Sequence, residues 1–217
     1  MKKPKQIKSI LIYGGSFDPP HIGHIKTACA VQQTFSFDKF IFVPCKQSVL
    51  KNMSVATSKQ RIDMLKLALA PYANPEFRFE IDTRELDRDT PSYMVDTLES
   101  FHQDNHYNKN ASFTLLLGMD AFLDFPRWHQ WEKILTLCDL LIMQRAGFHQ
   151  NKPLPQELQA ALNTSSCKLH FFEAGNYSIA SSTLRERINA HETLEKNQLP
   201  KAVHDYIKGH QLYQTLL

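Results

Sequence analysis

Two glycines and two histidines near the start of the chain have the spacing expected of a phosphate-binding turn. Residues 14–24 read Gly-Gly-Ser-Phe-Asp-Pro-Pro-His-Ile-Gly-His. Gly14 and Gly15 allow the backbone to turn tightly and to approach a ligand closely. His21 and His24 are three positions apart, so they share one face of the helix predicted to begin at residue 21 or 22. Because unpaired N–H groups at a helix start favour anions, the segment predicts a phosphate site with two imidazole donors. The alternative is a glycine turn with two surface histidines.

A second set of anion-binding groups lies near the other end of the chain. Residues 179–185 read Ile-Ala-Ser-Ser-Thr-Leu-Arg and open a predicted helix, with Ser182 as its N-cap and Arg185 in its first turn. A hydroxyl, unpaired backbone N–H groups and a guanidinium together predict a second anion site. A capped helix with a surface arginine is the alternative.

The middle of the chain contains a helix start that suits a carboxylate. Residues 85–98 read Glu-Leu-Asp-Arg-Asp-Thr-Pro-Ser-Tyr-Met-Val-Asp-Thr-Leu and follow a predicted strand. Thr90 or Ser92 is expected to cap the helix, and the backbone N–H groups at such a start can bind a carboxylate. A plain capped helix would give the same local sequence.

An acidic residue and several aromatic residues follow the strongest predicted strand, residues 113–117. Asp120 lies just past the end of that strand, where an acid often binds ribose hydroxyls. The aromatic residues that come next are Phe122, Phe125, Trp128 and Trp131. We expect all of them except Trp128 to belong to the core.

Short apolar runs alternate with amphipathic stretches along the chain, which is the pattern of a parallel sheet covered by helices. The predicted strands are residues 9–13, 39–43, 77–81, 113–117, 140–144 and 169–173. The predicted helices are residues 22–35, 58–69, 92–103, 131–136, 154–162, 182–190 and 201–208. The expected fold class is α/β, a Rossmann-like parallel sheet flanked by helices, with a small helical C-terminal part at about residues 178–217. In such sheets, ligands bind beyond the carboxyl ends of the strands.

One predicted helix, residues 58–69, has a clear apolar face. Ile62, Leu65 and Leu69 fall on one side at helical spacing, and Met64 and Leu67 widen that side.

The composition restricts the class of protein further. Of the 217 residues, 42% are hydrophobic and 22% charged, as in soluble globular proteins, and the net charge of +3 is too small to indicate a nucleic-acid partner. The four cysteines lie far apart and form no C-x-x-C pair, which argues against a zinc site or a disulfide framework. We therefore expect reduced thiols in a cytoplasmic protein. No stretch approaches the roughly 20 apolar residues of a membrane helix.

The first segment resembles the GxFDPxHxGH signature of the nucleotidylyltransferase superfamily. This resemblance implies in-line attack by a phosphate on the α-phosphorus of a nucleoside triphosphate, without a covalent intermediate and with catalysis by positioning and charge stabilisation. It implies that His21 and His24 hold the triphosphate, with His24 closest to the developing charge. Ser16 and Phe17 would complete the backbone cradle begun by the two glycines.

The letters His-Ile-Gly-His also spell a motif of class I aminoacyl-tRNA synthetases. Those enzymes need a second loop of the type KMSKS, and residues 51–54, Lys-Asn-Met-Ser, are a poor copy of it. The chain is also too short to include a tRNA-binding domain.

Further strings resemble one branch, the bacterial nicotinate-nucleotide adenylyltransferases. Residues 85–98 are similar to that family's R-x-x-PSYT-x-DTL segment, which implies that Thr90, Ser92 and Tyr93 face the nicotinate carboxylate. Residues 125–131 are similar to its F-x-x-W-x-x-W. That likeness implies that Trp128 stacks on the pyridine ring and that the backbone N–H of His129 meets the carboxylate.

The same resemblance assigns the ATP side of the site. The family's GxD makes Asp120 the ribose ligand. Its ISST-x-IR segment, read here from residue 179, implies that Ser181, Ser182 and Arg185 bind the ATP phosphates. Lys51 is retained as a phosphate ligand, although leucine stands where the family usually has histidine, and a solvated loop is the alternative. The resemblance spans nearly the whole chain, which is read as a single nucleotidyltransferase domain, residues 1–217.

The sequence thus predicts adenylyl transfer from ATP to nicotinate mononucleotide, giving deamido-NAD and pyrophosphate. The mononucleotide phosphate is already anionic at pH 7, so no general base is needed. Mg²⁺ is expected to accompany ATP, held mainly by phosphate oxygens, because no carboxylate cluster suggests a protein-built metal site.

One alternative is a related transferase whose acceptor is phosphopantetheine or nicotinamide mononucleotide. Another is a non-catalytic nucleotide sensor or RNA-binding module on the same fold, which the two histidines and Arg185 argue against. The sequence does not predict the oligomeric state.

Overall fold

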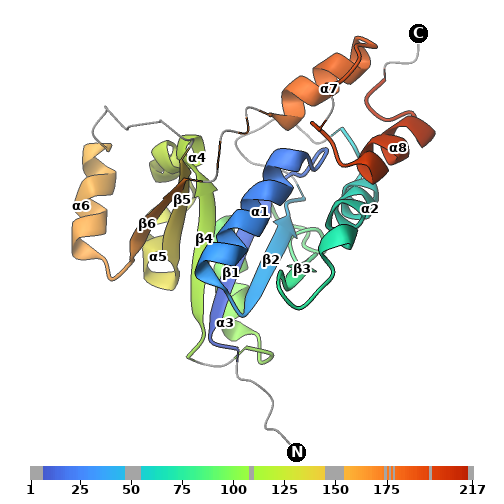
Figure 1. Ribbon diagram of the computed structural model, residues 1–217. Helices are drawn as coiled ribbons and strands as arrows, with labels where there is room; N and C mark the ends of the chain where they lie inside the picture. The colour runs from blue at the N-terminus through green and yellow to red at the C-terminus, as the bar shows by residue number, and fades with distance from the viewer. Residues whose placement is uncertain are drawn as a thin grey trace, which may run out of the picture.

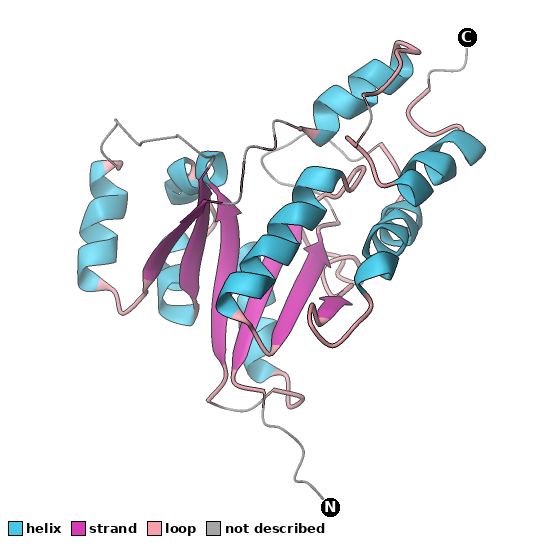
Figure 2. Ribbon diagram, viewed as in Figure 1, coloured by secondary structure: helices cyan, strands magenta, loops and turns pink. Residues whose placement is uncertain are grey.

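The computed structural model describes residues 7–46, 55–107, 110–144, 154–173, 175, 177, 179–195 and 197–214. Within this part of the chain lies a parallel sheet of six strands with the order β3-β2-β1-β4-β5-β6 (Figures 1 and 2). The strands are β1 (Ser9–Gly15), β2 (Lys39–Pro44), β3 (Phe79–Ile81), β4 (Ser112–Gly118), β5 (Asp139–Gln144) and β6 (Leu169–Glu173). The order reverses between β1 and β4, and a crevice for ligands is expected beyond the carboxyl ends of these two strands.

Helices cover both faces of the sheet (Figure 2). They are α1 (Ile22–Phe35), α2 (Ser58–Leu69), α3 (Met94–Gln103), α4 (Met119–Leu123), α5 (Trp131–Leu137), α6 (Gln156–Thr164), α7 (Ser181–Asn189) and α8 (Lys201–Gly209). Two short 3₁₀ helices, η1 (Ala70–Tyr72) and η2 (Phe125–Arg127), follow α2 and α4. None of the helices in the described residues has the length and apolarity needed to span a bilayer.

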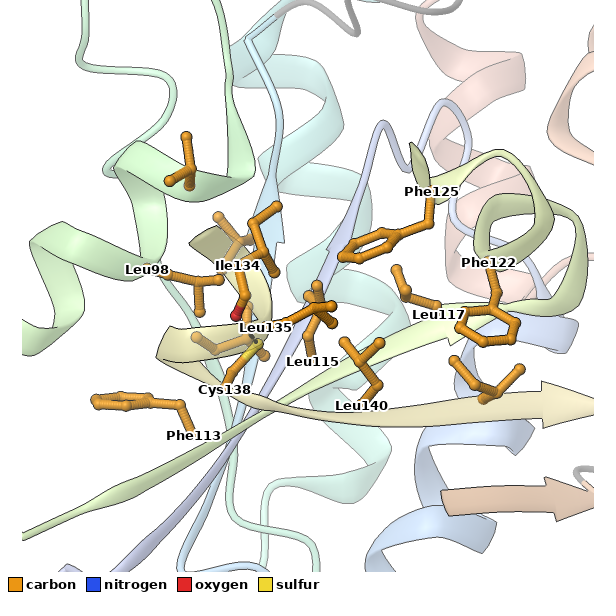
Figure 3. Close-up of a cluster of buried hydrophobic side chains, with 14 of the residues drawn as sticks. Leu98, Phe113, Leu115, Leu117, Phe122, Phe125, Ile134, Leu135, Cys138 and Leu140 are labelled. Atoms are coloured by element: carbon orange, nitrogen blue, oxygen red, sulfur yellow. Dashed lines mark hydrogen bonds between the residues drawn. The ribbon is translucent and has the colours of Figure 1, made fainter. Parts of the chain in front are cut away.

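Successive residues of β1 enter two different cores. Ile10 and Ile12 pack with α3, α4 and α5, while Leu11 packs with α1, α2 and α8, and all three side chains are fully buried. The labelled members of the first core in Figure 3 are Leu98, Phe113, Leu115, Leu117, Phe122, Phe125, Ile134, Leu135, Cys138 and Leu140. Burial of each large apolar side chain contributes about 1.5–3 kcal/mol, so the central strands form a rigid platform for the turns that leave them.

The predicted fold class is confirmed, and the corrections concern the bounds of elements, one additional helix and the buried face of α2. The strand predicted from residue 77 begins at Phe79, because the Asn74 carboxamide oxygen accepts bonds from the N–H groups of Glu76 and Phe77 (2.9 and 3.4 Å) and holds a turn. Arg78 has a positive φ of 49°, which ends that turn. The short helix α4 was not predicted.

The buried face of α2 also differs from the prediction. Ile62 and Leu67 are half-buried, whereas Arg61 is buried together with Met64, Leu65 and Ala68. A guanidinium thus lies among apolar residues, and its contacts matter for the site.

The C-terminal part is helical, as predicted. The buried Val203 and Ile207 of α8 lie in one core with Met64 and Leu65 of α2, and Leu184 is the buried residue of α7. Figure 1 shows α7 near the carboxyl ends of the strands and close to the start of α1. This position brings the second predicted anion site to the edge of the sheet that carries the first.

Candidate active site

The glycine turn, residues 14–20, links the end of β1 to α1. Phe17 adopts a positive φ of 48° and is 1% exposed, with its ring 5.6 Å from those of Tyr13 and Phe42, measured between centroids. The N–H of Cys45, just after β2, donates to the Gly15 carbonyl at 3.0 Å. An aromatic anchor on one side and the neighbouring strand on the other therefore fix the path of the turn.

Three carbonyl groups of the glycine turn accept bonds from side chains of other elements. Arg61 Nη1 of α2 donates to the Ser16 carbonyl at 2.7 Å. In α7, Arg185 Nη1 donates to the Asp18 carbonyl at 2.6 Å and Ser181 Oγ donates to the Pro19 carbonyl at 2.9 Å. In a trans peptide the N–H points opposite to the C=O, so the bond from Arg61 directs the next N–H, that of Phe17, away from the guanidinium. Side chains of α2 and α7 therefore hold the backbone of the glycine turn.

His21 and His24 form a reciprocal cap at the start of α1. The His24 N–H donates to His21 Nδ1 at 3.4 Å, and the His21 N–H donates to His24 Nδ1 at 3.2 Å. Because Nδ1 accepts in both rings, each neutral imidazole carries its proton on Nε2 and donates through that atom. The rings stack with centroids 3.6 Å apart, and burial lowers the pKa of His21 to about 4. His21 is therefore a neutral hydrogen-bond donor at pH 7.

The segment before α3 approaches the end of β2. Ser92 Oγ accepts a bond from the Lys46 N–H at 2.9 Å, and the Lys46 amine donates to the Arg88 carbonyl. The prediction that Thr90 or Ser92 caps this helix is wrong. Tyr93 occupies the cap position without a side-chain bond, because the Ser92 hydroxyl bonds to the neighbouring loop, and Thr90 is exposed.

A buried carboxylate lies beneath this segment. Glu85 is 2% exposed and accepts a bond from Thr97 Oγ1 at 2.7 Å. Burial raises the pKa of the Glu85 carboxyl, while bonds from Thr97 and Ser92 and the charge of Arg88 oppose that rise. Glu85 was not predicted to belong to the site. Its bond with Thr97 connects the segment before α3 to that helix.

The aromatic residues predicted to contact the substrate belong to two ring pairs. The ring centroids of Tyr93 and His129 are 4.4 Å apart, and the half-buried Trp128 packs on Phe125 at 5.4 Å. Phe125, like Phe122, is fully buried, as predicted.

Asp120 lies in the first turn of α4, directly after β4, and is exposed. It therefore stands at the carboxyl edge of the sheet, where the sequence predicts a ribose ligand.

The two groups of predicted residues meet at Gly14. A methyl group on Gly14 would come within 2.8 Å of Met94 Cε, at the start of α3. The turn that holds His21 and Arg185 therefore touches the helix start that follows Tyr93, and segments from four regions of the chain converge at one edge of the sheet.

Two further predictions for the phosphate ligands have different outcomes. The N-cap of α7 is Ala180 and not Ser182, which is exposed, because the first helical residue is Ser181, whose hydroxyl donates to the Pro19 carbonyl. Lys51 lies outside the described residues.

Three residues buried around the glycine turn were not predicted to belong to the site: Asp18, Arg61 and Tyr213. Arg61 had a signal that could have been used, since it stands three, four and seven positions before Met64, Leu65 and Ala68 on the packed face of α2. Asp18 lies inside the recognised motif. No local pattern distinguishes Tyr213.

Comparisons with known proteins agree with this geometry. The cytidylyltransferase-like family matches residues 12–187. A probable nicotinate-nucleotide adenylyltransferase of Legionella pneumophila (strain Lens) is 47% identical over 218 residues, which cover 95% of this chain and 99% of the relative. A protein of the same description from Marinomonas sp. (strain MWYL1) is 33% identical, with 96% of each chain covered. The chain belongs to the nicotinate-nucleotide adenylyltransferase family.

Solved structures support the fold of this nicotinate-nucleotide adenylyltransferase family member. A nicotinic acid mononucleotide adenylyltransferase of Plasmodium falciparum complexed with NaAD has a TM-score of 0.76 and 21% identity, over 95% of this chain and 97% of that one. The same enzyme complexed with APC has a TM-score of 0.70. At this level of identity the similarity concerns the fold, and the predicted roles of single residues remain predictions.

Proposed function

We propose that this protein transfers the adenylyl group of ATP to nicotinate mononucleotide, releasing pyrophosphate and forming deamido-NAD. Membership of the family supports the reaction, and the observation that carries it is the joining of the imidazole pair and Arg185 at one turn. A phosphate oxygen of the mononucleotide forms a bond to the α-phosphorus of ATP as the bond from that phosphorus to the bridging oxygen breaks. The electron pair of the broken bond leaves with pyrophosphate.

The roles of the residues follow from the contacts above. The Nε2–H groups of His21 and His24 donate to the triphosphate, and as fixed donors they stabilise the charge that develops during transfer. Because His21 is uncharged, its donation depends on orientation, which the reciprocal cap provides. Arg185 uses Nη1 to hold the turn, and its side chain is 25% exposed, so the same guanidinium can face the triphosphate.

The acceptor side is assigned to the aromatic group. Trp128 offers a partly exposed indole face for the pyridine ring, beside the paired rings of Tyr93 and His129. Asp120 is the ribose ligand in this proposal. The contact between Gly14 and Met94 sets the two substrates side by side, so that the mononucleotide phosphate lies near the α-phosphorus.

The site fits an Mg²⁺ ion that arrives with ATP and has phosphate oxygens as its ligands. Among the described residues there is no group of three or more His, Cys, Asp or Glu side chains that could hold a metal ion. In this proposal phosphate oxygens and water would hold the ion, which would neutralise charge on the triphosphate. The cytoplasmic location and the lack of a nucleic-acid partner stay predictions from the sequence.

A pyrophosphate-release assay with ATP and a panel of acceptors tests the proposal. We expect the highest kcat/KM with nicotinate mononucleotide, and mass spectrometry should identify the product as deamido-NAD. Trp128→Phe should raise the KM for the mononucleotide and leave the KM for ATP unchanged. Faster release with nicotinamide mononucleotide or phosphopantetheine would reassign the acceptor. RNA binding without pyrophosphate release would favour the non-catalytic alternative.

A further inference from the structure

We propose that Tyr213 is a positioning residue for ATP, acting through the carboxylate of Asp18 to keep Arg185 available to the triphosphate. The inference rests on the proposed function for the identity of the nucleotide. Tyr213 follows α8 and is separated from Asp18 by 195 positions in the sequence.

Asp18 is a buried junction between parts of the chain that are distant in sequence. Its side chain is 1% exposed, and Oδ1 accepts from Tyr213 Oη at 2.7 Å and from the Ala56 N–H at 3.2 Å. Oδ2 accepts from the Val55 N–H at 2.8 Å. A buried carboxylate is stable only when such donors replace water, so each bond has a large effect.

Arg185 lies next to this junction and forms a long ion pair with the carboxylate, but no hydrogen bond to it. Its Nη1 is 3.9 Å from Asp18 Oδ2 and donates instead to the Asp18 backbone carbonyl at 2.6 Å. The guanidinium thus has two competing acceptors on the same residue. The tyrosine and the two amides already satisfy the carboxylate, which leaves Arg185 on the carbonyl that orients the glycine turn.

The Tyr213 hydroxyl is suited to donate a hydrogen bond to Asp18 at all times. Its side chain is 7% exposed, and burial, followed by the neighbouring Asp18 charge, raises the pKa of its phenol far above the usual range. The phenol therefore keeps its proton at neutral pH. The hydroxyl also lies 3.9 Å from Met64 Sδ in α2, so the ring is packed as well as bonded.

Loss of this hydroxyl should redirect Arg185. The carboxylate would lose its shortest bond, and the Arg185 guanidinium, 3.9 Å from Oδ2, can replace it with a charge-assisted bond. Arg185 would then move from the backbone carbonyl to the carboxylate, and its charge would be neutralised beside the triphosphate. Binding of ATP should weaken, whereas binding of the mononucleotide at the Tyr93 side should not.

Tyr213→Phe tests this mechanism, with Tyr206→Phe as a matched control. Tyr206 of α8 also donates its hydroxyl to a carboxylate, that of Asp63 at 3.3 Å, but this pair lies outside the junction. The readouts are the Kd of an unreactive ATP analogue by calorimetry, the KM values of both substrates, and the midpoint of thermal unfolding. We expect Tyr213→Phe to raise the Kd and KM for ATP about tenfold, with the KM for the mononucleotide unchanged. Tyr206→Phe should change neither.

A second variant separates this mechanism from a general loss of structure. Asp18→Asn removes the charge that attracts Arg185, so adding Tyr213→Phe to that background should weaken ATP binding less than in the wild type. An equal effect in both backgrounds, or a parallel rise in both KM values that follows the loss of thermal stability, would overturn the proposal. If the wild type binds the ATP analogue but does not react with nicotinate mononucleotide, the proposed acceptor fails while the Kd comparison still tests Tyr213.

Discussion

Replacing His24 by asparagine should remove most of the turnover while leaving the start of α1 in place. The His24 ring has two functions that this substitution separates: Nδ1 accepts from the His21 N–H at 3.2 Å, and Nε2 carries the donor proposed to face the triphosphate. The amide oxygen of asparagine lies about where Nδ1 lies and can still accept the bond. No atom of asparagine reaches the position of Nε2.

The magnitudes of the two effects differ enough to be measured apart. Loss of one preorganised donor to the developing charge lowers kcat by about 10²–10³-fold. Loss of a cap lowers the free energy of unfolding by about 1 kcal/mol. We therefore expect similar low kcat values for His24→Asn and His24→Ala, with a lower free energy of unfolding for the alanine variant alone.

The start of α2 supplies the control. Gln60 Oε1 accepts from the Thr57 N–H at 2.9 Å in a cap of the same kind, away from the imidazole pair. Gln60→Ala should cost about as much stability as His24→Ala and should leave kcat unchanged. Pyrophosphate release gives kcat, and urea unfolding gives the stability. A His24→Asn enzyme with turnover near that of the wild type would refute the assignment of Nε2 as a catalytic donor.

Three further predictions concern buried groups near the site. Burial lowers the pKa of His21 from 6.5 to about 4, so the unfolded chain takes up a proton at a higher pH than the folded protein does. The free energy of unfolding should therefore fall by up to about 3 kcal/mol as the pH drops from 6.5 to about 4. Urea titrations should show a smaller fall for His21→Asn. The raised pKa of Glu85 has the opposite effect on stability, because the free energy of unfolding falls as the pH rises and the buried carboxyl ionises. Glu85→Gln should therefore raise the thermal midpoint more at pH 8 than at pH 5. In kinetic assays Gly15→Ala should lower kcat/KM for ATP more than Gly14→Ala, because the added methyl would lie 3.0 Å from the packed ring of Phe17, whereas at Gly14 it meets the flexible end of a methionine.

The fold could be predicted because central parallel strands, buried on both faces, read as continuous apolar runs. All six predicted strands are present, and the errors lie where side chains bond to backbone groups. Asn74 closes a turn that delays β3, and the hydroxyl of Ser92 bonds to Lys46 instead of capping α3. Such choices depend on which partner is near in space, and local propensity does not contain that information.

The candidate site was predictable where its residues fall in one short string, and less so where they come from distant segments. The spacing of His21 and His24 indicated a shared face, and the structure adds that they cap one another. Arg61 lies at an apolar position of α2 and was not predicted, because its function depends on the Ser16 carbonyl, which lies beside it only in the folded structure. Tyr213 meets Asp18 across 195 positions, a distance that no helical or strand periodicity spans.

The separation between Asp18 and Tyr213 also bears on how the protein is made. During translation β1 and the glycine turn leave the ribosome long before Arg185 and Tyr213, the residues that hold this turn. Contacts between such distant positions form slowly, because a long loop must close before they bring any gain. A nascent chain can therefore begin to assemble its sheet before the residues proposed to complete the nucleotide site are available.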